Sequence, residues 1–327
     1  MLLYGLAALQ AMDVFLNWTP DLADARQLRR EHAADIASLL ARGSVISLAV
    51  AVVLGLVGIA AAWHPVVPGA MCGTGVLQAM GPYGRRAMLF WGLGLIVLHA
   101  WQVLDRMNRS DPEGPATRTA ARMLIAAAPL LVLAVHSSWL ALMHADAVPA
   151  VSCCAAVYDR ILAGPAEKTA AVRFSVLAFW GHLIGGVALL GLAIRESRTP
   201  GRVPGAGMAG LAFLWAVAAA VAVKQVWSAS YYQVLSHPCP WCLFLPEYHG
   251  AGFIIFGCGA VIVMEAAAIW SADSLFRRYP QLAQAASRRL RSSARRIIWA
   301  LIGFAMTAAG PAIFWRLHTG AWIKALF

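Results

Sequence analysis

Apolar runs long enough to cross a lipid bilayer recur along the whole chain. Eight such runs are separated by polar breaks, and they cover residues 1–18, 43–64, 86–105, 119–143, 173–195, 207–228, 249–272 and 297–317. A helix of about 20 apolar residues spans the roughly 30 Å hydrocarbon core of a bilayer. Only 13% of the 327 residues are charged and 61% are apolar, whereas soluble domains have about 25% and about 45–50%. The sequence therefore predicts a polytopic membrane protein, and it excludes a soluble enzyme, a disordered chain and a disulfide-stapled miniprotein.

The spans are expected to be helices, because only helices and closed barrels satisfy their backbone amides within lipid. No alternating barrel strands are visible. The predicted fold is therefore an all-α transmembrane bundle of about eight spans. The run 1–18 is the weakest of them, being short and carrying Gln10, Asp13 and Asn17. It lacks the basic flank and cleavage signal of a signal peptide, so we expect it to be retained.

The basic residues are unevenly distributed between the polar breaks. The segments 19–42, 105–122, 195–206 and 273–296 hold 4, 4, 3 and 7 of the 26 Lys and Arg residues. The positive-inside rule assigns these segments to the cytoplasm, and both termini to the opposite, periplasmic side of the inner membrane. Basic runs beside apolar spans meet lipid headgroups, so the net charge of +11 indicates a bilayer as partner and no nucleic acid. Segment 19–42 is expected to form an amphipathic cytoplasmic helix.

Five of the six cysteines fall in predicted periplasmic loops. Cys72 lies in loop 65–85, Cys153 and Cys154 in loop 144–172, and Cys239 and Cys242 in loop 229–248, whereas Cys258 lies within a span. In an oxidising compartment such cysteines are paired or take part in thiol exchange. Cys258 is expected to be a packing residue.

The most specific motif is Cys239-Pro240-Trp241-Cys242. A Cys-x-x-Cys at a helix start brings two sulfurs within disulfide reach, and the helix N-terminus lowers the pKa of the attacking thiol. The motif is expected to open the span 249–272. A structural disulfide and half of a metal site remain as alternatives.

From residue 119 the order is span, loop with Cys153-Cys154, span, cytoplasmic turn, span, and Cys-Pro-Trp-Cys before the next span. This order resembles the four-helix core of the vitamin K epoxide reductase family and the related disulfide-generating quinone reductases. The resemblance covers residues 119–272. It divides the chain into an N-terminal region 1–118 with three spans, this core, and a basic cytoplasmic loop with the last span in 273–327.

The resemblance implies a membrane thiol–disulfide oxidoreductase. Electrons would pass from the thiols of a periplasmic thioredoxin-like protein, through Cys153 or Cys154, to Cys239 and Cys242, and then to a quinone (ubiquinone or menaquinone). Cys153 and Cys154 are adjacent where the family separates its loop cysteines, so Cys72 is a further candidate for exchange. The candidate contacts for the quinone are Trp241, Phe244, Lys224 and His249.

Three other functions are consistent with the sequence. His136 and His182 lie in neighbouring predicted spans and could ligate a haem b. A Cu(I) site could use soft periplasmic ligands, namely Cys72, Cys153, Cys154, Cys239 and Cys242. Alternatively, the chain is a membrane subunit of a larger transport or electron-transfer complex, in which the cysteines form structural disulfides.

A weak internal repeat relates two of the loops. Cys72 is followed by Gly-Pro, Arg and Phe-Trp, and Cys153-Cys154 are followed by the same elements in the same order. This pattern predicts that Cys72 is equivalent to Cys153 or Cys154.

Overall fold

The computed structural model describes residues 2–19, 24–145, 165–232 and 239–321, with side chains from residue 172 onward in the third range. Every regular element in these ranges is helical, which confirms the all-α prediction. The long helices are α1 (Leu2–Asn17), α2 (Ala25–Val57), α4 (Gly81–Asn108), α5 (Thr117–Met143), α7 (Pro165–Arg198), α8 (Gly205–Ala222), α10 (Ala251–Arg278) and α11 (Ala283–Thr319). Shorter helical pieces are η1 (Gly58–Ala62), α3 (Gly73–Ala79), η2 (Val223–Trp227), α9 (Ser228–Tyr232), η3 (Pro240–Phe244), η4 (Pro246–Tyr248) and η5 (Pro280–Leu282).

Seven helices in the described residues are long and apolar enough to cross a membrane. Their outward faces carry large apolar side chains such as Leu54, Trp139 and Leu177, as lipid-facing surfaces do. The chain is an integral, multi-pass membrane protein. The sequence predicted about eight spans, and the predicted first span, 1–18, is not among these seven helices. Helix α1 has 16 residues, or about 24 Å at 1.5 Å per residue, and is too short to cross.

Two segments expected to lie outside the membrane are continuous with spanning helices. The predicted amphipathic helix 19–42 does not end before the predicted span 43–64. One continuous helix runs from Ala25 to Ala62. The predicted basic loop 273–296 is mostly helical: α10 continues to Arg278, and α11 begins at Ala283 after a single turn. Residues 25–42 and 283–296 contain no Gly or Pro, so nothing stops the helix at the lipid boundary, and these charged stretches are the ends of long helices.

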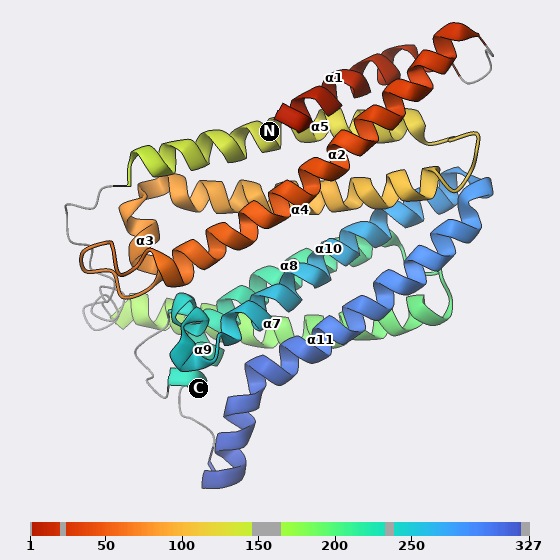
Figure 1. Cartoon of the computed structure of the whole chain (residues 1–327). Helices are drawn as coiled ribbons and strands as arrows, with labels where there is room; N and C mark the ends of the chain where they lie inside the picture. The colour runs from red at the N-terminus through yellow and green to blue at the C-terminus, as the bar shows by residue number, and fades with distance from the viewer. Residues whose placement is uncertain (1, 20–23, 146–164, 233–238, 322–327) are drawn as a thin grey trace.

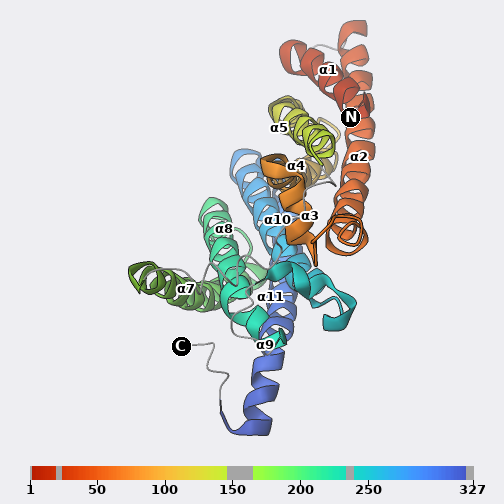
Figure 2. The same ribbon diagram turned by 90° about the vertical axis from the view of Figure 1, so that its left-hand side faces the viewer.

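The eight long helices of the described residues form two four-helix units with the same order of contacts. In the first unit α1 contacts α2, α2 contacts α4, α4 contacts α5 and α5 contacts α1; the second unit repeats this with α7, α8, α10 and α11. Figure 1 shows that corresponding helices run in the same direction, and Figure 2 shows the two units side by side, with α4 against α10 between them.

Helices α4 and α10 show how closely the units correspond. Each has 28 residues. Each ends with a buried aspartate paired to the arginine four residues later, Asp105 with Arg109 and Asp273 with Arg277. In the structure, α4 and its preceding Cys72 loop therefore match α10 and its preceding Cys239–Cys242 loop. The sequence repeat predicted that Cys72 is equivalent to Cys153 or Cys154. The described helices instead make the Cys72 loop equivalent to the loop that holds Cys239 and Cys242.

The expected grouping of helices within residues 119–272 is also different. A core of that extent would unite α5 with α7, α8 and α10. Instead α5 packs mainly on α4 and α1, and the second unit is completed by α11.

A buried ionic cluster lies where the two units meet. Glu265 of α10 is 5% exposed. It accepts hydrogen bonds from Arg289 at 2.6 Å and from Arg296 at 2.8 Å. His99 of α4 lies 3.6 Å from the same carboxylate. Because His99 belongs to the first unit and the other three residues to the second, this cluster fixes the register between the units.

The connections α1–α2, α4–α5, α7–α8 and α10–α11 lie at one end of the bundle, and the α2–α4 and α8–α10 connections lie at the other (Figure 1). The first end carries the basic segments, and the second carries the described loop cysteines. The predicted separation of basic residues from loop cysteines is thus present in the fold. Helix α1 begins part-way along the bundle rather than at the cysteine end (Figure 1).

Candidate functional site: a cluster of three cysteines

Cys72, Cys239 and Cys242 meet at the cysteine end of the bundle, and their sulfur atoms all lie within 4.8 Å of one another. The Sγ atoms of Cys72 and Cys239 are 3.3 Å apart, and the hydroxyl oxygen of Thr74 is also 3.3 Å from Cys239 Sγ. Cys72 is completely buried and Cys242 is 7% exposed, whereas Cys239 is half-buried. We call these three residues the cysteine triad.

Each four-helix unit supplies part of the triad. Cys72 comes from the first unit, where it directly precedes α3. Cys239 and Cys242 come from the second unit, where Cys239 precedes η3 and Cys242 lies within it. The triad therefore exists only when the two units are packed together.

The Cys-Pro-Trp-Cys motif does not open the spanning helix, as the sequence analysis expected. It forms a separate 3₁₀ turn, and α10 begins nine residues after Cys242, at Ala251. His249 and Gly250 adopt left-handed backbone conformations between them, with φ of 54° and 62°. These conformations redirect the chain, so that the motif lies across the bundle end rather than along α10.

The contact between Trp241 and Gly73 holds the two loops together. A Cβ atom built on Gly73 would lie 2.6 Å from Cε3 of Trp241. Only a glycine permits this approach, because any side chain would overlap the indole ring. The tryptophan of the motif is thus a packing residue between η3 and α3, and it sets the distance between Cys72 and Cys239.

Aromatic side chains extend from the triad toward the outer surface. The ring centroids of Trp241 and Phe244 are 5.4 Å apart. The ring of Phe244 also stacks on that of Phe256, with centroids 5.5 Å apart, and meets that of Phe253 edge-on, with centroids 4.9 Å apart. Phe253 is 41% exposed. The predicted contacts Trp241 and Phe244 therefore belong to an apolar wall of aromatic rings that begins in the motif and reaches the surface at Phe253. The hydroxyl of Tyr232 donates to the carbonyl oxygen of Cys239 and fixes the backbone there.

Hydrogen bonds stabilise the thiolate form of Cys239. The Cys242 and Cys72 side chains donate to its sulfur and lower the pKa of the Cys239 thiol, with a smaller effect from Thr74, whereas burial opposes this shift. A thiolate is both the nucleophile and the better leaving group in thiol–disulfide exchange. Cys239 is therefore held in the thiolate form, from which a thiol attacks or leaves a disulfide.

The other residues predicted for this site are less closely associated with it. Lys224 lies in η2 and is exposed, and His249 is exposed in the turn before α10. Cys153 and Cys154 lie outside the described residues. Cys258 is on α10, where its sulfur faces Gly303 of α11, as expected for a packing residue.

The structure does not bring together the two histidines considered as haem ligands. His136 is exposed on α5, in the first unit. His182 is buried on α7, in the second unit, where its Nε2 accepts a hydrogen bond from the indole of Trp227 at 3.2 Å. Helices α5 and α7 lie on different flanks of the molecule (Figure 2).

Thr74, Gly73 and Tyr232 belong to the site but were not singled out by the sequence analysis. Thr74 lies two residues after Cys72, and a hydroxyl so close to a cysteine was the one sequence feature that could have indicated a hydrogen bond to a sulfur. The roles of Gly73 and Tyr232 depend on contacts with residues far along the chain, which no local pattern reveals.

Comparisons with protein-family models, with curated proteins and with solved structures found no match to this chain. The geometry of the site therefore carries the functional argument.

Proposed function

We propose that this chain is a membrane thiol–disulfide oxidoreductase that passes electrons from protein thiols, through the cysteine triad, to a quinone. The observation that carries this proposal is the position of Cys239, whose sulfur lies within reach of two other cysteine sulfurs. A disulfide bond is about 2.05 Å long, so a movement of little more than 1 Å would join Cys239 to Cys72.

The first half-reaction would oxidise the motif. Cys239 and Cys242 lose two electrons and two protons in forming a disulfide, and the quinone gains both and becomes the quinol. The apolar wall of Trp241, Phe244 and Phe253 supports this step, because a lipid-soluble quinone can approach from the exposed side of Phe253.

The second half-reaction would return the triad to its thiol form. The incoming thiolate, from Cys153, Cys154 or a thioredoxin-like partner, attacks Cys239, which is the least buried of the three sulfurs. The Cys239–Cys242 bond breaks and Cys242 leaves as a thiolate, which takes up a proton. A second thiolate then attacks the incoming sulfur and displaces Cys239, whose stabilised thiolate is a good leaving group. Cys72 offers an alternative partner for Cys239 while Cys242 is reduced.

The test uses the full chain in lipid nanodiscs, with ubiquinone-1 as acceptor and a reduced thioredoxin-fold protein as donor. We expect quinone reduction that is lost in Cys239→Ser and Cys242→Ser. Cys258→Ser, which removes a cysteine outside the triad, should retain it. Undiminished turnover in Cys242→Ser would refute the proposal.

A second candidate function is favoured by the same three sulfurs. Three thiolates around one ion at about 2.3 Å would be separated by about 4 Å. The three sulfurs lie within 4.8 Å of one another, and those of Cys72 and Cys239, now 3.3 Å apart, would move apart slightly to hold the ion. Such a set suits a soft ion such as Cu(I). Titration of the reduced chain with Cu(I) against a chelator distinguishes the two functions. Stoichiometric Cu(I), lost in Cys72→Ser, together with no quinone reduction, would favour metal handling.

A further inference from the structure

A cavity of about 800 Å³ lies at the opposite end of the molecule from the cysteine triad. It is open on one side and is lined by α1, α2, α4, α5 and residues 111–115 of the α4–α5 connection, and its lining includes Trp18, Gln27, Ser38, Trp101, Asp105 and Arg109. The volume is within the range of about 300–1,000 Å³ that small-molecule sites occupy.

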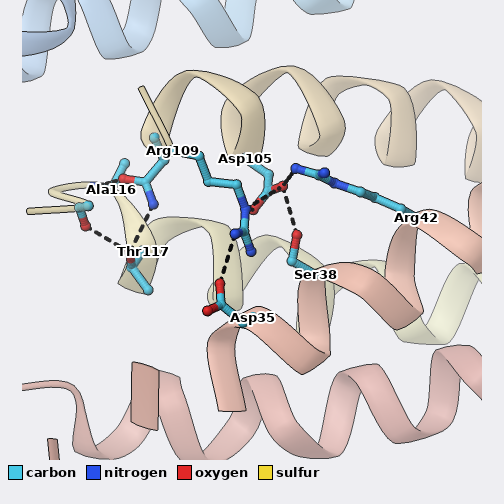
Figure 3. Close-up of polar contacts among 9 residues, drawn as sticks. Asp35, Ser38, Arg42, Asp105, Arg109, Ala116 and Thr117 are labelled. Carbon is cyan, nitrogen blue, oxygen red and sulfur yellow. Dashed lines mark hydrogen bonds and ion pairs between the residues drawn. The ribbon is translucent and has the colours of Figure 1, made fainter. Parts of the chain in front are cut away.

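Polar contacts between α2 and α4 lie on one side of this cavity (Figure 3). Asp105 is 5% exposed. Its carboxylate accepts hydrogen bonds from Arg42 at 2.6 Å and from Ser38 at 2.8 Å. Arg109 also contacts Asp105 at 3.3 Å and reaches Asp35 at 2.8 Å. These contacts join α2 to α4 and order the side chains on this side of the cavity.

The second unit shows that the fold does not by itself require a cavity at this position. There, Asp273 accepts a hydrogen bond directly from the backbone N–H of Gly205 at 3.0 Å. A Cβ on Gly205 would lie 2.8 Å from Cβ of Asp273, so α8 and α10 are in direct contact. The first unit replaces this backbone contact with Ser38 and Arg42, and the space remains open.

The cavity is acidic, although the chain as a whole carries a charge of +11. Among the described residues, its lining includes five carboxylates and one cation, namely Glu31, Asp35, Asp105, Asp111 and Glu113, and Arg109. Arg109 and Arg42 pair with Asp105 and Asp35. In the described residues no ion pair is formed by Glu31, Asp111 or Glu113. The remaining charge is complementary to a cationic ligand.

Two tryptophans complete the recognition surface. Trp18 and Trp101 both line the cavity, and tryptophan faces attract quaternary ammonium groups. Trp101 is 1% exposed. Its indole N–H is buried and has no hydrogen-bond partner among the described residues. An acceptor oxygen on a ligand would satisfy this donor after a small movement of the ring.

We propose that this cavity binds an organic cation that combines an ammonium group, a hydrogen-bond acceptor and an apolar portion. The carboxylates at the mouth attract the ammonium group, the half-buried ring of Trp18 contacts it, and the alanine-rich wall formed by Ala11, Ala37 and Ala121 accommodates the apolar portion. This site is distinct from the cysteine triad and does not depend on the function proposed there.

The test is isothermal titration of the full chain in nanodiscs with benzoylcholine and with 3,3-dimethylbutyl benzoate. The two esters have nearly the same shape, but only benzoylcholine is charged. We expect one benzoylcholine per chain, with an affinity at least tenfold higher than that of the neutral ester and reduced by added salt. Equal affinity for both esters would overturn the proposal.

Variants separate binding in the cavity from binding elsewhere. The double variant Glu31→Gln, Glu113→Gln removes two mouth carboxylates that form no ion pair in the described residues, and we expect it to weaken benzoylcholine binding at least fivefold. The matched control Glu247→Gln removes an exposed carboxylate from η4 at the cysteine end and should leave the affinity unchanged. Equal affinities in the double variant, the control and the parent chain would also overturn the proposal.

Discussion

The sulfur atoms of Cys72 and Cys239 lie 3.3 Å apart although 167 residues separate them in the chain. The two cysteines come from equivalent loops of two four-helix units, and the packing of α4 on α10 brings these loops together. The cysteine triad is thus built at the junction of two similar halves, each of which holds only part of it.

Mild oxidation should link Cys72 to Cys239. In the variant Cys242→Ser, we expect a Cys72–Cys239 disulfide in most molecules after treatment with diamide, because the two sulfurs are already in contact. Peptide mapping by mass spectrometry without reduction measures it. Cys258, whose sulfur faces Gly303, should remain a thiol and serves as the internal control. Absence of the linked peptide would contradict the observed contact.

The rate at which Cys239 is alkylated should depend little on pH. The hydrogen bonds from Cys242 and Cys72 lower the pKa of Cys239, so its thiolate persists as the pH falls below the usual thiol pKa of about 8.5. We expect its rate with iodoacetamide to change by less than about twofold between pH 8 and pH 6. The alkylation rate of an ordinary thiol falls roughly tenfold for each unit by which the pH is lowered in this range.

Peptide-resolved mass spectrometry gives the rate for each cysteine. The substitution Cys72→Ala removes one of the stabilising donors, so it should raise the pKa of Cys239 and restore a steeper pH dependence. A rate for Cys239 that falls tenfold per unit in the parent chain would show that its thiolate is not stabilised.

The substitution Gly73→Ala should damage the cysteine triad. The new methyl group would lie 2.6 Å from the ring of Trp241, so η3 must move away from α3. Overpacking of this kind costs about 1–3 kcal/mol, and we expect a lower melting temperature and a lower yield of the Cys72–Cys239 disulfide. Gly92→Ala is the matched control, since a Cβ there meets nothing within 4 Å. Equal disulfide yields in the two variants would mean that the Trp241–Gly73 contact does not set the sulfur distance.

Replacing Asp105 by Asn should destabilise the first unit. Arg42, Ser38 and Arg109 all donate to this buried carboxylate. Removing one partner of a buried ion pair typically costs about 3–5 kcal/mol. Asp13→Asn on α1 is the control, because Asp13 is exposed and bonds only to Asn17 among the described residues. Thermal unfolding in detergent measures both variants, and similar melting temperatures would contradict the structural role of Asp105.

The sequence by itself determined the membrane character, the helical class and the clustering of loop cysteines away from the basic segments. These properties follow from composition and from local runs of residues, because burial of apolar side chains in lipid and backbone pairing within a helix involve residues close together in the chain. The reactive potential of Cys239-Pro240-Trp241-Cys242 was visible for the same reason.

The tertiary structure alone decided which helices pack together and which cysteine faces the motif. The apolar pattern of α5 fits a partner in either half of the chain. Its actual place beside α4 and α1 depends on side-chain packing over the whole bundle. Likewise, the contact of Trp241 with Gly73 and the open space beside Asp105 arise from surfaces more than sixty residues apart. Such contacts depend on the shape of the assembled helices, which no local run of residues encodes.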